Sequence, residues 1–455
     1  MFELFRSPRR VLVFLFEMVL VGVLVVVAGC IRLGLHVGLS YGNVGKRAIV
    51  FMVVMQAVLY YAGFFDPLFV RQPRRAFTKV LQALALSTVI NVLIYYFFPR
   101  LEIGRGIYLT SVALIAVVLP LWRIFYDSVT DSAGFRRNVL ILGSGALAKE
   151  LAEMIRDKPS HGLNLVGLLA RDRSPGDTEG GIIGTYKELS DIVTRENVQL
   201  VLVAYPDRRG TLPVEQLLEV KFRGVEVEEG IDFYEHMMGK IYVRELKPSQ
   251  LIFAEGFTSR LTTRRLKRIL DLICSGIGLT LAAPIMMLTA ILIKLESKGP
   301  IFYQQVRAGE FGKLFTIVKF RSMRTDAEKH GAQFAKENDD RVTKVGAFIR
   351  KTRIDELPQL WNVLKGEMSM VGPRPERPVF IEQLEQQVPF FKQRLYVKPG
   401  LTGHAQVRCP YGATTEDMLE KLQYDLYYIK AYSVLFDISV MFDTVKVVLF
   451  RIGSR

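Results

Sequence analysis

The chain has 455 residues, half of them hydrophobic, with a formal net charge of +15. This length accommodates two or three domains, and a mean hydropathy of +0.23 indicates membrane segments. The excess of cations fits membrane-flanking segments on the cytoplasmic side, which are attracted to anionic lipid headgroups, or a pocket for a phosphorylated substrate. We expect no nucleic-acid partner, because there is no basic patch with interleaved aromatic residues and no recognisable nucleic-acid motif.

The three cysteines, Cys30, Cys274 and Cys409, have neither paired nor metal-ligand spacing. Two of them lie in apolar runs, so we interpret them as packing residues in a reducing compartment. The five histidines form no HExxH motif and no other metal cluster.

Four apolar runs, at 11–31, 49–65, 80–98 and 107–126, each approach the roughly 20 residues that a helix needs to cross a bilayer. The first is too long for a cleaved signal peptide and has no convincing cleavage site after it. Cations before the first run, around the second loop and after the fourth favour cytoplasmic ends. We therefore predict a four-helix transmembrane domain over residues 1–130. No charge was expected deep inside a run, which argues against a transport pathway.

Residues 136–234 alternate strand-like and helix-like segments, which predicts a Rossmann-like domain with a doubly wound parallel sheet. The turn GSGALA, with Gly143 and Gly145, has the spacing of a dinucleotide-binding fingerprint. Asp172 is the only candidate for a ribose-binding acid after the second strand, and loop follows it at once. A bound nucleotide is one interpretation. A tight strand-to-helix turn in a regulatory or assembly domain is the other, and we favour it.

Residues 235–263 predict a linker near the membrane surface. The following apolar run, which begins the domain at 264–455, is long enough to span a bilayer but has cations on both flanks. Pro284 near its middle removes a backbone hydrogen bond and favours a kink. We predict a re-entrant helix that enters one leaflet, breaks at Pro284 and returns, because a full span would place one cationic flank on the wrong side. A fifth span is the alternative.

The domain at 264–455 reads as α/β. Two strand-like pieces around EFGK predict a hairpin. The segment IDELPQLWNVLKG predicts a short helix with Asp355 and Glu356 in its first turn. A capping pattern at Thr414 and Asp417 begins a later helix. The apolar tail predicts an amphipathic helix on the membrane, with a core helix as the alternative.

The stretch 319–375 holds the densest mixture of acids and cations in the chain. Such a mixture fits phosphoryl chemistry, because arginines and a divalent ion hold phosphate oxygens while a carboxylate attacks phosphorus or binds the metal. A solvated surface is the better interpretation of any single residue. The group as a whole, beside an apolar segment, suits a substrate that is part lipid and part phosphate.

Residues 264–449 resemble the bacterial polyprenyl-phosphate hexose-1-phosphate transferases, also called monotopic phosphoglycosyl transferases. The motifs that carry the resemblance are, in order, KRILD, GPIFYQQVRAG, KFRSM, DELPQLWNVLKGEMSMVGPRP and KPGLTGHAQV. The transmembrane and Rossmann-like segments upstream are similar to the long form of this family, which is associated with exopolysaccharides.

The resemblance implies transfer of a sugar 1-phosphate from a UDP-sugar to undecaprenyl phosphate, with release of UMP, as the first membrane step of exopolysaccharide synthesis. It also implies the bacterial inner membrane, a catalytic domain on the cytoplasmic face, Mg²⁺, and a ping-pong reaction through a phosphosugar ester on an aspartate. It does not identify the sugar or the oligomeric state, and a homodimer is one of the states that it allows.

The adjacent Asp-Glu pair of the family falls at RTDAE, where Ala327 separates the two acids. We expect Asp326 to be the nucleophile and a metal ligand, with Glu328 as its partner. Side chains two apart on a helix point about 200° apart, so the acids converge only if the backbone there is not a regular helix. The expected substrate-binding residues are Arg307, Lys319, Arg321, Arg353, Asp355, Glu356, Asn362 and Arg374. Of these, Glu356 and Asn362 could instead cap and pack.

Two other classes of protein are alternatives. Membrane-anchored nucleotide-sugar dehydratases also join four spans to a Rossmann domain, but they need a nicotinamide cofactor and a Tyr-x-x-x-Lys pair. None of the 18 tyrosines here has a lysine four positions later. A non-catalytic scaffold of polysaccharide assembly is the second alternative, and the intact acids and the GPRP motif argue against it.

Overall fold

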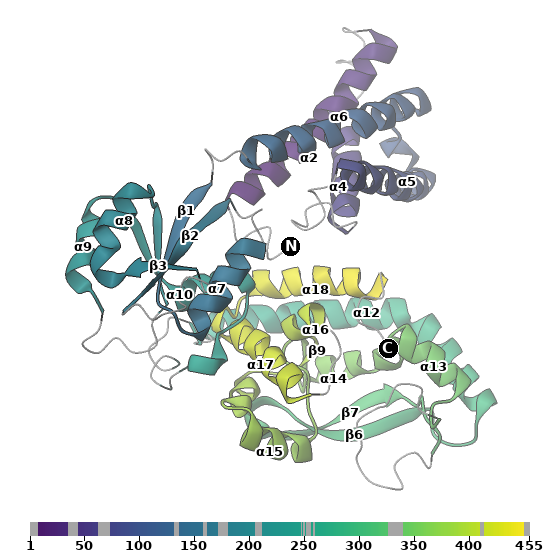
Figure 1. Cartoon of the computed structure of the whole chain (residues 1–455). Coiled ribbons are helices and arrows are strands. Elements are labelled where there is room, and N and C mark those ends of the chain that lie inside the picture. The colour runs from purple at the N-terminus through teal and green to yellow at the C-terminus, as the bar shows by residue number, and fades with distance from the viewer. Residues whose placement is uncertain are drawn as a thin grey trace. The chain divides into compact units, whose positions relative to one another are not determined.

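The computed structural model describes residues 8–34, 44–61, 73–131, 136–157, 162–171, 181–204, 212–246, 260–325, 340–409 and 414–449, with a few isolated positions between 248 and 257 (Figure 1). The chain divides into two units, one of which runs from Glu3 to Phe233 and the other from Tyr234 to Arg455. The first unit holds the apolar bundle and the parallel sheet, and the second holds the remaining α/β domain.

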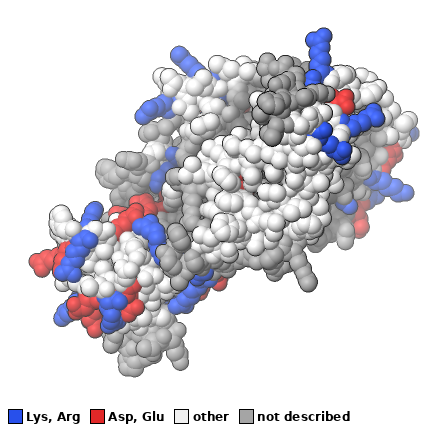
Figure 2. All heavy atoms as spheres, turned by 90° about the horizontal axis from the view of Figure 1, so that it is seen from above, with Lys and Arg blue, Asp and Glu red and all other residues white. Residues whose placement is uncertain are grey.

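The four predicted apolar runs form helices. These are α2 (Pro8–Leu33), α4 (Val44–Tyr61), α5 (Pro73–Phe97) and α6 (Arg105–Asp131), with the short η1 (Pro99–Leu101) between the last two. Side chains such as Val25, Phe51 and Ile115 are buried between the helices, while large apolar side chains cover the outer faces. Figure 2 shows a broad uncharged surface with Lys and Arg gathered at its edges. Three of the helices are long and apolar enough to span a membrane, and the apolar part of α4 is shorter.

One charged pair lies inside the bundle, contrary to our expectation. Glu17 of α2 is fully buried and accepts a hydrogen bond of 3.1 Å from Arg123 of α6. A charge inside a helical bundle is tolerated when it pairs with an opposite charge. The pair ties the first and fourth helices together.

The predicted doubly wound sheet is confirmed. All its strands are parallel, in the order β3-β2-β1-β4-β5. They are β1 (Arg137–Leu142), β2 (Leu163–Ala170), β3 (Ile182–Thr185), β4 (Leu200–Val203) and β5 (Glu226–Glu229), with α7 (Ala146–Asp157), η5 (Tyr186–Glu188), α8 (Leu189–Arg195) and α9 (Val214–Phe222) on the connections. Sequence reasoning missed β3, a short edge strand without a clear period-two pattern.

Close backbone packing explains why glycine occupies the turn after β1. Gly143 has a φ of +136°, and a Cβ there would lie 2.2 Å from the carbonyl oxygen of Ala204, which follows β4. Only glycine allows this close approach of two strand ends. The geometry favours the tight-turn interpretation of GSGALA, and Asp172 lies outside the described residues.

Part of the predicted linker at 235–263 is packed structure. Helix α10 (Gly230–Met238) leads into η6 (Val243–Glu245), and Ile241, Tyr242 and Val243 are almost completely buried. Ile241 donates a backbone hydrogen bond of 3.1 Å to Gln423, far along the chain. This segment therefore belongs to the core of the C-terminal unit.

The C-terminal unit is built around the 36-residue helix α12 (Leu261–Glu296) and the antiparallel hairpin of β6 (Phe302–Ala308) and β7 (Leu314–Phe320). The turn of the hairpin is η7 (Glu310–Gly312). The elements that follow are α13 (Lys344–Lys351), η8 (Ile354–Glu356), α14 (Gln359–Lys365), β8 (Ser369–Val371), α15 (Pro378–Gln387), η9 (Phe391–Tyr396), β9 (Gly400–Thr402), α16 (His404–Arg408), α17 (Thr415–Lys430) and α18 (Val434–Leu449).

The KRILD motif joins α12 to this unit through buried polar contacts. Lys267, 2% exposed, contacts the carboxylate of Asp437 on α18 and donates to the hydroxyl of Tyr428 on α17 at 2.7 Å. Arg268 donates to the last carbonyls of α14, at 2.7 Å each. Asp271 accepts from the Ser369 hydroxyl and from a backbone N–H of β8. This long apolar helix is thus bound to three separate parts of the domain.

Pro284 does not break α12. The helix continues through it to Glu296 and bends along its course (Figure 1). Proline removes one backbone hydrogen bond but keeps a helical φ, so a kinked helix is the outcome rather than two helices. Apolar side chains on both sides of Pro284, such as Leu281 at 73% exposure and Met287, are open to a surrounding medium.

Other local predictions are confirmed or refined. Thr414 and Asp417 form the predicted capping box. The predicted helix at IDELPQLWNVLKG divides into η8 and α14 around Pro358. Helix α18 combines both interpretations of the tail, since Phe436 is buried while Leu435 is exposed.

The packing of α10 and η6 predicts where the chain can be divided. A chain of residues 230–455 should unfold cooperatively, because it keeps the whole of the C-terminal unit. A chain of residues 256–455 loses Ile241, Tyr242 and Val243, and deletion of each fully buried side chain costs about 2–5 kcal/mol. Its unfolding temperature in detergent should be lower by at least about 5 °C. Equal unfolding temperatures would show that residues 230–255 are a linker after all.

Candidate active site

A single carboxylate joins three segments of the C-terminal unit. Glu356 Oε1, on η8, accepts hydrogen bonds from Lys319 Nζ at 3.1 Å and from Arg374 Nη2 at 2.9 Å. Lys319 lies near the end of β7, and Arg374 lies in the GPRP turn after β8. The Glu356 side chain is 12% exposed, so these charge-assisted bonds form in a partly dry environment where they are strong. We call Lys319, Glu356 and Arg374 the carboxylate cluster.

The neighbouring Asp355 has the opposite electrostatic character. Burial, followed by the charge of Glu356, raises the pKa of Asp355 to about 6. Burial also acts to raise the pKa of Glu356, but Lys319 and Arg374 outweigh it and hold that pKa well below its usual range. Two adjacent carboxyls whose pKa values are pushed apart are typical of sites that do chemistry.

Two further arginines surround these acids. Arg353 begins η8 with a left-handed φ of +60°, a conformation that costs a non-glycine residue about 1 kcal/mol. Its guanidinium forms no hydrogen bond within the described part of the chain, yet its charge lowers the pKa of Glu356. Arg350 of α13 acts on Asp355 in the same way. Cations therefore outnumber carboxylates here, as a phosphate site requires.

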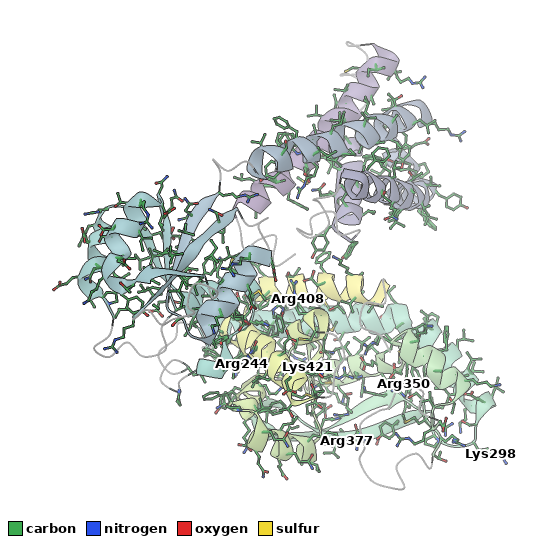
Figure 3. All side chains as sticks on the ribbon, viewed as in Figure 1. Arg244, Lys298, Arg350, Arg377, Arg408 and Lys421 are labelled. Atoms are coloured by element: carbon green, nitrogen blue, oxygen red, sulfur yellow. The ribbon has the colours of Figure 1, made fainter. Side chains whose placement is uncertain are left out.

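Figure 3 shows where other cations of this unit lie. Lys298 follows α12, Arg350 is on α13, and Arg377 precedes α15. Of these three, Arg350 acts on the site, since its charge lowers the pKa of Asp355.

A second turn holds the backbone just before Arg374. Gly372 donates a backbone hydrogen bond to Thr402, and Gly400 donates one to Pro373, each at 2.9 Å. A Cβ on Gly400 would lie 2.1 Å from the Gly372 nitrogen. The motifs GPRP and KPGLTG thus need their glycines because the two backbones touch, which fixes the backbone of the GPRP turn up to Pro373.

Three predicted substrate-binding residues have other partners. Arg321 is buried and donates to the carbonyls of Ser297 and Lys298, beyond the end of α12. The amide of Asn362 bridges two backbone groups of β7 and also donates to Glu367. Arg307 donates to the carbonyl of Pro375 and lies 3.6 Å from Glu376. These contacts favour a supporting role for all three.

The predicted acids Asp326 and Glu328 lie outside the described residues. The two ends of their segment are held together, because the backbone N–H of Arg324 donates to Arg341 at 2.9 Å and Thr343 donates to Ser322 at 3.1 Å. Ser322 closely follows β7, which carries Lys319, so the segment starts within a few residues of Lys319 along the chain. Gly143 and Gly145 belong to the other unit and are not part of this site.

Sequence reasoning missed two buried charge pairs. Lys267 with Asp437 is one, and Arg394 with Asp425, 2.7 Å apart, is the other. A signal was available, because Asp425 and Asp437 stand on the apolar faces of their helices, where periodicity predicts a hydrophobic residue. A charge in such a position indicates a buried partner.

Comparison with known proteins gives the class of this chain. A model of the bacterial sugar transferase family matches residues 262–451, and a model described as a CoA-binding domain matches residues 60–218. The chain belongs to the bacterial sugar transferase family. The CoA-binding-type domain upstream is typical of its long-form members.

Several curated relatives are similar over most of their length. A UDP-glucose:undecaprenyl-phosphate glucose-1-phosphate transferase of Escherichia coli is 31% identical, over 81% of each chain. An undecaprenyl-phosphate galactose phosphotransferase of Salmonella typhimurium is 30% identical, over 78% of each chain. A UDP-N-acetylgalactosamine-undecaprenyl-phosphate N-acetylgalactosaminephosphotransferase of Aeromonas hydrophila is 47% identical over 42% of this chain and 45% of its own, so the chain spans about half of that relative.

The raised pKa of Asp355 predicts a pH-dependent stability. The folded state holds this proton more tightly than the unfolded chain, whose ordinary pKa is 3.8. The stability linked to the proton is complete below pH 4 and is lost as the pH rises through 6. Asp355→Asn, which mimics the protonated form, should therefore raise the free energy of unfolding by about 2 kcal/mol at pH 8 and hardly change it at pH 4.

Thermal unfolding at the two pH values checks this, with the exposed Asp340→Asn as the matched control. A variant that is less stable than the wild type at pH 8 would show that ionised Asp355 is stabilised by its cations instead.

Proposed function

We propose that this protein transfers a sugar 1-phosphate from a UDP-sugar to undecaprenyl phosphate and releases UMP. The observation that carries the proposal is the carboxylate cluster. It presents Lys319 and Arg374, with Arg353 beside them, in a domain bound to a long apolar helix. A substrate with a charged diphosphate and a lipid acceptor needs both features. The named activities of the relatives from E. coli and Salmonella support the same reaction class.

Asp326 is proposed as the nucleophile. Its carboxylate attacks the phosphorus that carries the sugar, and the bond between that phosphorus and the bridging oxygen breaks. UMP leaves with the bridging oxygen and the electron pair, and a phosphosugar ester remains on Asp326. A phosphate oxygen of the lipid then attacks the same phosphorus, which releases the carboxylate and forms a lipid diphosphosugar. Glu328 is proposed as the partner of Asp326.

The carboxylate cluster is proposed to hold the phosphate oxygens during both steps. Arg374 and Arg353 present planar guanidinium groups, which match phosphate oxygens in pairs, and Lys319 adds a point charge. Glu356 keeps Lys319 and Arg374 from repelling one another when no substrate is bound. Preorganised cations of this kind stabilise the charge of a phosphoryl-transfer transition state without reorganisation.

Mg²⁺ is proposed as the cofactor, with Asp326 as its protein ligand. Mg²⁺ is usually bound by one or two carboxylates together with substrate phosphates rather than by a cage of protein ligands. The described residues contain no group of three or more His, Cys, Asp or Glu that could hold a metal. Glu356 is a poorer candidate, because Lys319 and Arg374 already bind its Oε1 and would oppose a further cation there. When bound, Mg²⁺ would neutralise charge on the phosphates.

The chain is proposed to sit in the bacterial inner membrane with its catalytic domain on the cytoplasmic face, where UDP-sugars are made. Helix α12 is proposed to enter and leave on that same face. Its bent course and the cations on both flanks support re-entry. Lys267 and Arg268 bind the catalytic domain at one end, and Arg321 binds the segment beyond the other end, so both ends belong near one domain. The dehydratase and scaffold alternatives receive no support from the named relatives.

The proposed nucleophile is tested by substitution. Asp326→Asn should lower UMP release from a UDP-sugar by at least about 10³-fold, because removal of a covalent nucleophile leaves only binding and electrostatic stabilisation. UMP would be measured with undecaprenyl phosphate present, over UDP-glucose, UDP-galactose and their N-acetylated forms. Chelation should abolish release, and Mg²⁺ should restore it. Asp340→Asn, at the far end of the same segment, is the control. Undiminished release by Asp326→Asn would assign the nucleophile elsewhere.

Re-entry of α12 is tested by labelling. Single cysteines at positions 262 and 298, in a chain without its three native cysteines, should both react with a membrane-impermeant maleimide only after the cytoplasmic face is opened. A full span gives one cysteine that reacts from the outside of intact cells and one that does not. That result would overturn the re-entrant topology.

A further inference from the structure

A buried arginine lies directly behind the turn that carries Arg374. Arg394 of η9 is 6% exposed and donates through Nη2 to the backbone carbonyl of Arg374 at 3.3 Å. The same nitrogen lies 2.7 Å from Asp425 on α17, and Nη1 lies 3.9 Å from Glu376. The guanidinium also stacks over the ring of Phe391, 4.9 Å from its centroid. Arg394 therefore connects the GPRP turn to two helical elements.

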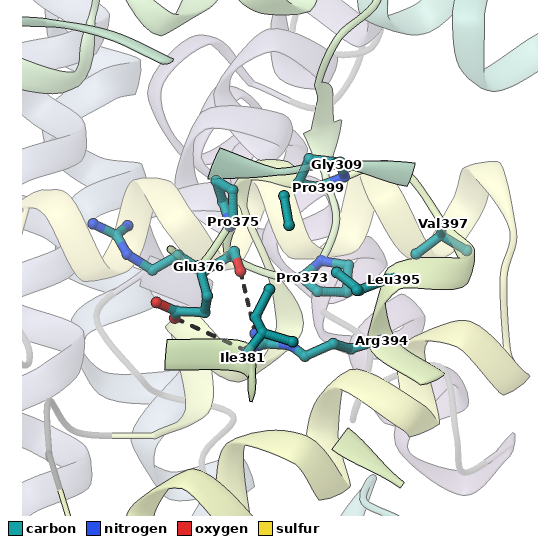
Figure 4. Close-up of a pocket in the computed structure, with 11 residues that line it drawn as sticks. Gly309, Pro373, Pro375, Glu376, Ile381, Arg394, Leu395, Val397 and Pro399 are labelled. Atoms are coloured by element: carbon teal, nitrogen blue, oxygen red, sulfur yellow. Dashed lines mark hydrogen bonds and ion pairs between the residues drawn. The ribbon is translucent and has the colours of Figure 1, made fainter. Parts of the chain in front are cut away.

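An open pocket lies beside the turn on this side. Pro373 and Pro375 line it together with Leu395, Val397 and other residues. Figure 4 shows Arg394 reaching along this pocket toward the turn. The hydrogen bond and ion pairs of Arg394 restrain the turn at this pocket.

Arg374 is therefore held by two separate contacts. Its carbonyl is bound by Arg394 from behind, and its guanidinium is bound by Glu356 in front. We propose that Arg394, oriented by Asp425, is a positioning residue that sets where the guanidinium of Arg374 meets the substrate phosphate. This inference rests on the proposed function. Arg394 acts through Arg374 and does not itself reach the reacting atoms.

The geometry requires an arginine rather than a generic cation. The planar guanidinium reaches the Arg374 carbonyl, Asp425 and Glu376 together while it stacks on Phe391. A lysine ammonium in the same place offers one nitrogen and no flat face, so it cannot keep all of these contacts. A loss of the contact to the turn lets Arg374 move, and a misplacement of about 1 Å at a reacting phosphate costs as much as 10²-fold in rate.

A double-mutant cycle in the full-length protein tests the proposal. Arg394→Lys should lower kcat/KM for the UDP-sugar at least about tenfold, mainly in kcat, when Arg374 is present. In the Arg374→Lys background the same substitution should change kcat/KM by less than about twofold, because the residue through which it acts is already altered. Asp425→Asn, of the same size as the native residue, should give the same pattern. Lys392→Gln, on the same element in an exposed ion pair with Glu385, is the control.

Thermal unfolding of each variant separates positioning from stability, since a stability loss is expected to be the same in both backgrounds. Equal losses of kcat/KM in the two backgrounds would overturn the proposal, as would full activity of Arg394→Lys. If Arg394→Lys does not fold, Asp425→Asn decides by the same criteria. A wild-type protein that releases no UMP from any UDP-sugar would instead overturn the proposed function, so the two failures are distinguishable.

Discussion

The two hydrogen bonds to one oxygen of Glu356 are the interaction on which the candidate site depends. They bring together a strand, a short 3-10 turn and a proline-rich turn, each contributed by a different part of the domain. Without this carboxylate, Lys319 and Arg374 would repel each other at close range in a partly dry environment. With it, the two cations stay close together, and a substrate phosphate can take over the negative charge that holds them. The acid organises the cations and leaves Arg353 available beside them.

A second constraint connects this site to the long apolar helix α12. Helix α12 carries Lys267, Arg268 and Asp271 on the face that meets the catalytic domain, and their partners come from α18, α14 and β8. A buried ion pair adds little net stability, but removal of one partner is costly, so such pairs specify a unique arrangement. The apolar faces of α12 that remain exposed can enter lipid without disturbing this arrangement. The long apolar helix and the turns around the carboxylate cluster are therefore parts of one packed unit.

Local patterns were enough to predict most elements. Apolar run length gave the bundle helices, alternation of strands and helices gave the parallel sheet, and the Thr414 and Asp417 spacing gave a helix start. Long-range partners could not be predicted, because a sequence does not say which surfaces meet. The carbonyl partners of Arg321 and the packing of Tyr242 depend on tertiary contacts alone.

Pro284 shows a different limit, since proline predicts a disturbed helix but not whether the helix bends or ends. Within the site, residue types pointed to phosphate chemistry, and geometry then separated the cluster around Glu356 from residues that only support it.

The central claim is that one phosphate site serves both halves of the reaction through a phosphosugar held on the protein. Exchange of label between UMP and a UDP-sugar, measured in purified protein without any lipid acceptor, tests this claim most directly. If the sugar phosphate passes to the protein first, labelled UMP will be incorporated into the UDP-sugar, and Asp326→Asn will abolish the incorporation. An absence of exchange in a wild-type protein that still transfers sugar phosphate when undecaprenyl phosphate is added would contradict the account and indicate direct transfer between the two substrates.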